Sequence, residues 1–241
     1  MPPFTLQTAV VTGASSGIGA AIALCLAEEG AKLCLIGRNS NALESVAAQA
    51  RKRSPDVHTY RADLCDDADM AKLQTDLKRD CDRVDILIHS AGVIALGILE
   101  SASLEDFDRQ FRTNVRAPYV LTQTLLPTLR TNQGSVVFIN SSSGMNTRAG
   151  ISQYSATKHA LKAIADSFRA EVNPDGVRVL SVYPGRTASP QQAAIHQAEG
   201  KPYSPELLMQ PADVARIIVD ALKVNRTAEV TDISIRPMRK S

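Results

Sequence analysis

The amino-acid sequence predicts an α/β fold: a doubly wound, seven-stranded parallel sheet with helices on both faces. Two observations support this prediction. Short apolar runs rich in β-branched residues alternate with longer stretches of helical period, and no Pro/Gly/Ser-rich linker divides the 241 residues. Such alternation is typical of parallel sheets whose crossover connections are helices. We therefore expect one domain covering residues 1–241.

The strands are expected at the apolar runs and the helices between them. The strand candidates are Thr8–Thr12, Lys32–Ile36, Val57–Arg61, Val84–His89, Ser135–Asn140, Arg178–Tyr183 and Glu229–Ile235. The helix candidates are Ile18–Glu29, Ala42–Arg53, Ala68–Arg79, Leu104–Leu129, Tyr154–Val172 and Ala212–Val224. Helix starts are indicated by Asn41-x-x-Glu44 and Ser103-x-x-Asp106, which resemble capping arrangements, and by Pro211, which suits a first turn.

Residues 186–210 form the one long stretch without clear periodicity, and they contain Pro190, Pro202 and Pro205. The stretch follows the sixth strand. Ligands of such sheets bind outside the carboxyl ends of the strands. Residues 186–210 are therefore either a substrate loop that covers a site or an ordinary surface loop.

Composition excludes several partners. With 27 basic and 25 acidic residues the net charge is +2, which favours neither nucleic acid nor a membrane surface. No cluster of basic residues along the chain argues for an acidic substrate. The four cysteines have no metal-ligand spacing, so we expect no metal and no disulfide framework. The first residues do not resemble a signal peptide, and we expect a cytoplasmic protein.

The turn after the first strand carries three glycines, Gly13, Gly17 and Gly19, and a helix follows it. Glycines in this position allow a tight turn and let backbone N–H groups approach a phosphate at the helix N-terminus. The second strand then ends in Gly37-Arg38, where an acidic residue would accept hydrogen bonds from a ribose 2′-OH of NAD. A guanidinium pairs well with a 2′-phosphate instead, so the sequence favours NADP(H).

Tyr154 and Lys158 are four residues apart in a predicted helix, which places the phenol and the ammonium on one face. A positive charge nearby favours phenolate. We therefore expect the pKa of Tyr154 to fall below its ordinary value of about 10.

Taken together, the sequence resembles the short-chain dehydrogenase/reductase family from Thr8 to about Ile235. The motifs that carry the resemblance are Thr12-Gly13-x-x-x-Gly17-x-Gly19, Asp63-Leu64, Asn114, Ser141 thirteen residues before Tyr154, Tyr154-x-x-x-Lys158 and Pro184-Gly185. The resemblance implies a Rossmann fold and an oxidoreductase that transfers a hydride between NADP(H) and a small-molecule ketone or secondary alcohol.

The resemblance also assigns roles to residues. Tyr154 would be the general acid/base, Lys158 would lower its pKa, Ser141 would hold the substrate oxygen, and Asn114 would hold a water that connects Lys158 to solvent. The residues implied to bind the cofactor are Gly13, Ser15, Ser16, Gly17, Ile18, Gly19, Arg38, Asp63, Leu64, Ser90, Ala91, Gly92, Asn114, Tyr154, Lys158, Pro184, Gly185 and Thr187. Either Thr187 or Ser189 would cover the carboxamide or pyrophosphate. A homo-oligomer, a tetramer or a dimer, is also implied.

The sequence departs from the family pattern after the fourth strand, where Asn-Asn-Ala-Gly is usual and His89-Ser90-Ala91-Gly92 stands here. We expect His89 to be a core residue and some sheet-stabilising hydrogen bonds at Ser90 to pass through water. Two other functions stay open: a non-catalytic NADP(H)-binding sensor, and an epimerase or dehydratase on the same fold. The intact Asn114, Ser141, Tyr154 and Lys158 argue against the sensor. The absence of a large substrate domain disfavours the epimerase or dehydratase.

Overall fold

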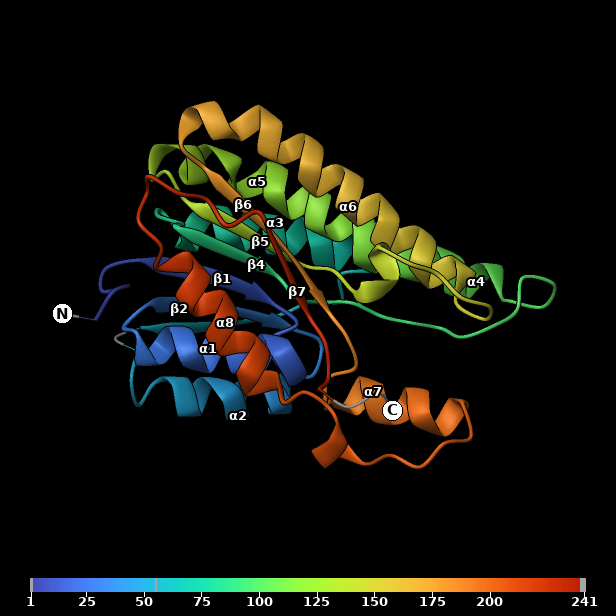
Figure 1. Ribbon diagram of the computed structural model, residues 1–241. Helices are drawn as coiled ribbons and strands as arrows, with labels where there is room; N and C mark the ends of the chain where they lie inside the picture. Colours follow the sequence, from blue (N-terminus) through green and yellow to red (C-terminus); the bar gives the residue numbers. More distant parts are fainter. Residues whose placement is uncertain (1, 55, 239–241) are drawn as a thin grey trace.

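Seven strands form one parallel sheet in the computed structural model, which describes residues 2–54 and 56–238. Their order across the sheet is β3-β2-β1-β4-β5-β6-β7, so the direction of winding reverses between β1 and β4 (Figure 1). The strands are β1 (Thr8–Thr12), β2 (Lys32–Gly37), β3 (Val57–Arg61), β4 (Ile86–His89), β5 (Ser135–Ile139), β6 (Arg178–Pro184) and β7 (Asp232–Ile235). The predicted doubly wound fold is confirmed.

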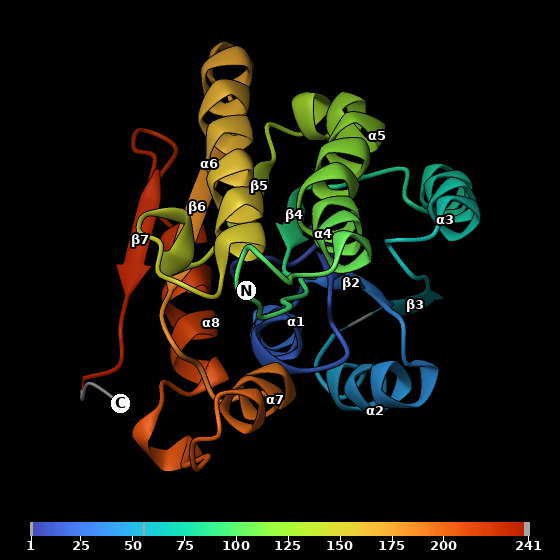
Figure 2. The same ribbon diagram turned by 90° about the vertical axis from the view of Figure 1, so that its right-hand side faces the viewer.

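Helices cover both faces of this sheet (Figure 2). One face carries α1 (Gly17–Glu28), α2 (Ser40–Ala50) and α8 (Pro211–Leu222), and the other carries α3 (Asp67–Asp80), α5 (Ala117–Thr131) and α6 (Ser152–Val172). Successive side chains of a strand point to opposite faces. Accordingly, Ala9 and Val11 of β1 belong to the first core, and Val10 belongs to the second.

Two of the three predicted helix starts are confirmed. The Ser103 hydroxyl accepts a hydrogen bond from the Asp106 N–H at 3.3 Å, and Pro211 occupies the first turn of α8. The cap predicted at Asn41 is wrong. The Asn39 side chain caps α2 instead, by accepting from the Ala42 N–H at 3.0 Å. The helix thus begins two residues earlier than its apolar pattern indicates, because the cap is set by the end of β2.

The helix predicted over Leu104–Leu129 is present as an unbroken helical run, but it is not α-helical throughout. The structure divides it into α4 (Leu104–Phe111), a π-helical turn at Arg112–Arg116, and α5. The π-turn contains Asn114, whose side chain is fully buried and hydrogen-bonded to the Val93 backbone. A π-turn accommodates one extra residue per turn and is frequent at functional sites. Sequence periodicity does not reveal it, because the flanking helices keep their apolar faces.

Residues 186–210 contain regular structure that the sequence did not predict. Helix α7 (Pro190–Ala198) begins at Ser189, whose hydroxyl accepts from the Gln192 N–H at 3.1 Å, and a short 3-10 turn follows at Pro205–Leu207. Pro190 occupies the first helical position, where a proline is tolerated. The helix lacks an apolar stripe, because its buried side chains are Gln192 and His196. Among the helices within residues 2–54 and 56–238, none is both long and apolar enough to cross a membrane.

Candidate active site

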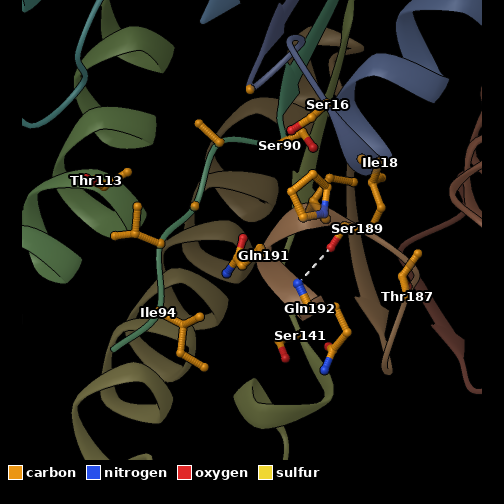
Figure 3. A pocket seen from close by; sticks show the side chains of 18 of the residues that line it. Ser16, Ile18, Ser90, Ile94, Thr113, Ser141, Thr187, Ser189, Gln191 and Gln192 are labelled. Carbon is orange, nitrogen blue, oxygen red and sulfur yellow. Dashed lines mark hydrogen bonds between the residues drawn. The ribbon is translucent and has the colours of Figure 1, made fainter. Parts of the chain in front are cut away.

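The carboxyl ends of the strands open into a cavity of about 630 Å³ (Figure 3). Its size is in the range usual for ligand pockets. All the predicted site residues except Asn114 line it. They are Gly13, Ser15, Ser16, Gly17, Ile18, Gly19, Arg38, Asp63, Leu64, Ser90, Ala91, Gly92, Ser141, Tyr154, Lys158, Pro184, Gly185 and Thr187. The tertiary structure therefore brings residues from six strand ends into one space.

The glycine turn has no room for side chains at Gly13 and Gly19. A Cβ on Gly13 would lie 2.8 Å from the Ala91 Cα, and a Cβ on Gly19 would lie 2.4 Å from the Gly13 carbonyl oxygen. Ser16 precedes α1, and its side chain makes no capping hydrogen bond. The first N–H groups of α1 are therefore available to an anion at the positive end of the helix. These residues fit the phosphates of a dinucleotide.

Thr12 joins the ends of β1 and β4, a role that the sequence analysis missed. Its hydroxyl donates to the Ile88 carbonyl at 3.3 Å and accepts from the N–H groups of Ser90 and Ala91, both at 3.1 Å. Ser90 was expected to leave part of this bonding to water. The contacts through Thr12 hold the backbone N–H groups of this segment directly, and the expected water at Ser90 stays a prediction. The side-chain hydroxyl holds the segment that forms one wall of the cavity.

The Arg38 side chain is exposed at the end of β2 and lines the cavity beside Asn39. Among the described residues, it forms no ion pair with an acidic side chain. Asp63 and Leu64, after β3, line the same end. Because an arginine without a carboxylate partner keeps its donors available, this end of the cavity suits a second anionic group beyond the glycine turn.

Ser141, Tyr154 and Lys158 meet at the opposite wall. The Lys158 ammonium lies 5.7 Å from the centroid of the Tyr154 ring and donates to the Ile139 carbonyl at 3.0 Å. Ser141 follows β5, and its hydroxyl accepts from the Ser143 N–H at 3.1 Å. The predicted proximity of the phenol and the ammonium is therefore present, with the serine hydroxyl beside the phenol.

The expected lowering of the Tyr154 pKa is wrong for these protein groups. Burial raises the pKa of Tyr154, and the hydrogen bond with Ser141 only partly opposes this. Burial also lowers the pKa of Lys158 to about 8. Sequence spacing places two groups together but contains no information on how much water surrounds them, and removal from water disfavours both charged forms. The phenol consequently keeps its proton at neutral pH, as a general acid requires.

Asn114 lies behind the cavity wall. Its amide accepts from the Val93 N–H and donates to the Val93 carbonyl, both at 2.8 Å, and donates to the Thr157 hydroxyl at 3.0 Å. A Cβ on Gly92 would be 3.4 Å from the Asn114 oxygen and 3.8 Å from the Lys158 nitrogen. Asn114 thus holds the chain after β4 against α6. Its expected role in holding a water stays a prediction.

Residues 7–200 match the family model described as short chain dehydrogenase. The chain belongs to the short-chain dehydrogenase family. An uncharacterized oxidoreductase of Staphylococcus aureus strain N315 is 32% identical over 239 residues, covering 99% of this chain and all of that protein. The glycine betaine reductase of Emericella nidulans is 33% identical over 241 residues, and the match covers 98% of this chain and 19% of that much longer protein.

Two solved oxidoreductase structures have the same fold. An alcohol dehydrogenase from Thermococcus sibiricus in complex with 5-hydroxy-NADP has a TM-score of 0.87 and 25% identity, covering 98% of both chains. A metagenomic short-chain oxidoreductase in complex with NADP has a TM-score of 0.84 and 27% identity, covering 99% of this chain and all of that one.

His89 is a core residue in this short-chain dehydrogenase, as expected. Its ring is stacked on Phe138 with centroids 5.0 Å apart, and its Nε2 lies 2.9 Å from the Thr122 hydroxyl. Burial lowers the pKa of His89 to about 3, so the ring is neutral at physiological pH. A neutral ring that is buried in the core and does not line the cavity takes no part in proton transfer there.

Both candidates after Pro184-Gly185 line the cavity, but in different roles. Thr187 is buried, and its hydroxyl donates to the Gly185 carbonyl at 3.1 Å. Ser189 caps α7 and faces the cavity together with Gln191 and Gln192 (Figure 3). The polar wall that α7 supplies was not predicted, because the helix itself was not.

A group of charged residues at the other end of α7 was also missed. Arg148, Arg186 and Lys201 surround the carboxylate of Glu199. These residues are far apart in sequence, so no basic cluster is visible along the chain. No basic cluster along the sequence argues for an acidic substrate, but the fold places Arg148 and Arg186 together in the lining of the cavity.

Proposed function

We propose that this short-chain dehydrogenase transfers a hydride between NADP(H) and a ketone or secondary alcohol. The observation that carries the proposal is that one cavity is lined both by the glycine turn and by the residues of the expected acid/base site. These residues are Ser141, Tyr154 and Lys158. A dinucleotide held at the glycine turn would extend toward them. The proposal thus rests on geometry in this chain in addition to family membership.

The choice of NADP(H) over NAD(H) is supported by two independent facts. Arg38 stands at the end of β2, where its guanidinium would pair with a 2′-phosphate. The similar alcohol dehydrogenase and the metagenomic oxidoreductase described above were solved with 5-hydroxy-NADP and NADP. Ser15, Ser16 and the N–H groups of the glycine turn would hold the remaining phosphates.

When bound, the cofactor supplies or accepts the hydride. The protein residues do the rest. The Ser141 hydroxyl orients the carbonyl oxygen and stabilises charge that develops there. Tyr154, protonated at neutral pH because burial raises its pKa, donates a proton to that oxygen in the reduction. In the oxidation Tyr154 must first lose its own proton, and the phenolate then accepts the proton of the alcohol.

Lys158 restores the proton of Tyr154 in this scheme. Its ammonium has a pKa of about 8, close to neutrality, because the side chain is buried. A group with such a pKa can both lose and regain a proton near physiological pH. The hydrogen bond that Lys158 donates to the Ile139 carbonyl fixes the position of its ammonium group in the cavity lining.

Replacing Tyr154 with Phe tests the proposal. We expect kcat for NADPH-dependent ketone reduction to fall by about 10²–10⁴-fold, the usual contribution of a general acid, while the Kd for NADPH, measured by fluorescence titration, changes little. The matched control is Tyr119→Phe, because Tyr119 is exposed on α5 and away from the cavity. A Tyr154→Phe protein that keeps a substantial fraction of the rate would disprove the assignment.

A further inference from the structure

The charged residues that line the cavity are unevenly distributed. Asp63 is the only acidic one among the described residues, and it stands with Arg38 at the side of β2 and β3. The other side, formed after β5 and β6, is lined by Arg148 and Arg186, and Arg109 of α4 also lines the cavity. A carbonyl compound beside Ser141 would therefore meet cations but no anion in the cavity wall.

Two of these arginines converge on one carboxylate. The Arg148 Nη2 lies 2.7 Å from the Glu199 Oε1, and the Arg186 Nη2 lies 3.0 Å from the same oxygen and 2.7 Å from Oε2. Lys201 approaches Oε2 at 3.3 Å. Three cations thus share a single carboxylate, which leaves two positive charges in excess (three minus one).

The carboxylate stays ionised in this environment. Burial alone would raise the pKa of Glu199, but hydrogen bonds from Arg186, Lys201 and Arg148 hold it at about 2. Glu199 therefore cannot gain a proton and withdraw its charge at physiological pH. It also cannot neutralise more than one of its three partners.

Arg148 has unused binding capacity. Its side chain is 56% exposed, and one of its five N–H donors is used, toward Glu199, with no other acceptor among the described residues. Arg186 is different: it is 25% exposed and also bonds the His196 ring at 3.1 Å. Arg186 therefore anchors Glu199 and α7, whereas Arg148 can present its remaining donors to a second carboxylate in a bidentate contact.

Apolar residues also line the cavity. They include Ile94, Ile151 and Ile195, which come from the β4–α4 connection, the start of α6 and α7. Figure 3 shows Ile94 across the cavity from Gln191 and Gln192, with Ser141 nearby. A substrate that has its carbonyl at Ser141 and an apolar chain against these residues would complement this wall if it also carried an anion for Arg148.

We propose that the substrate is an oxo acid or hydroxy acid whose carboxylate binds Arg148. This inference rests on the proposed function and narrows its substrate class. The competing explanation is that Arg148 only ties the segment before α6 to α7 through Glu199. If Arg148 has only this structural role, kcat/KM should not depend on whether the substrate carries a carboxylate. The two explanations therefore predict different kinetics.

The test compares oxo acids of increasing chain length with their methyl esters, at fixed NADPH, for wild type and Arg148→Gln. We expect the best acid to exceed its ester in kcat/KM by about ten-fold or more, as charge-assisted hydrogen bonds usually contribute. Arg148→Gln should raise KM for the acid by a similar factor and leave the ester unchanged. The matched control is Arg130→Gln, an arginine of similar exposure that pairs with Asp175 outside the cavity.

Two kinetic results would overturn the proposal: esters that react as well as acids, or an Arg148→Gln variant that weakens acids and esters equally. If NADPH binds but neither the oxo acids nor their esters are reduced, the proposed function fails. A binding measurement without turnover then tests the anion site at Arg148. Glutarate is titrated calorimetrically into the NADP⁺ complex. Binding that Arg148→Gln abolishes supports the site, and no binding by wild type rejects it.

Discussion

We propose that the choice of cofactor depends on Arg38. Replacing it with Asp would remove the partner of a 2′-phosphate and supply an acceptor for a ribose hydroxyl. We expect kcat/KM for NADPH to fall by about 10–100-fold and the value for NADH to rise. The control is Arg53→Asp, an exposed arginine just beyond the other end of α2. An unchanged NADPH/NADH ratio would remove Arg38 from the site.

His89 makes stability depend on pH. Its pKa is about 3 in the folded protein and about 6.5 when unfolded, so between these values only the unfolded chain binds the proton. Stability therefore falls as the pH falls from 6.5, by about 1.4 kcal/mol per pH unit. Urea unfolding between pH 7 and 5 should show wild type losing about 2 kcal/mol more than His89→Asn. Parallel pH curves for the two proteins would contradict the assignment.

At the scale of elements, the site depends on the junction of β1 and β4. The Thr12 hydroxyl accepts from two N–H groups of the β4 end. Thr12→Val keeps the shape but leaves these donors without a partner, which should cost about 1–3 kcal/mol of unfolding free energy and weaken NADPH binding. Thr12→Ser keeps the hydroxyl and is the control. The idea fails if Val and Ser variants bind NADPH equally well.

The other element that matters is α7, which forms a wall of the cavity with few apolar contacts of its own. Polar and ionic bonds hold it: Ser189 caps its start, and Arg186 bonds both His196 and Glu199 at its end. An element held mainly by such contacts tolerates rearrangement more easily than one held by a buried apolar face. Residues 186–210 were predicted to be either a loop over the site or an ordinary surface loop, and neither alternative included the helix α7. A role as a cover stays a prediction.

At the scale of the whole molecule, we predict how many copies of the chain associate. Exposed apolar residues stand on α4 and α5, including Phe111 (44% exposed) and Tyr119 (49%). We predict a homo-oligomer, so light scattering after gel filtration should give two or four times the 25.9 kDa of one chain. Tyr119→Glu should shift the mass toward the monomer. The control is Ile217→Glu, because Ile217 is exposed on α8, and this variant should not shift the mass. A wild-type monomer would contradict the prediction.

The sequence by itself determined the features that depend on residues close together along the chain. The sheet and the approximate positions of its strands follow from the apolar, β-branched runs that alternate with stretches of helical period. The glycine turn, Arg38, Ser141 and the Tyr154–Lys158 pair are visible because turn geometry and helical spacing are short-range properties. These residues do line one cavity.

Only the tertiary structure decided what depends on environment and on distant contacts. Burial raises the pKa of Tyr154, whereas sequence spacing predicted the opposite. The Thr12 link to the β4 end joins residues more than seventy positions apart, and Arg148 reaches Glu199 across fifty-one. Solvation and long-range proximity are properties of the folded chain, so no local pattern in the sequence records them.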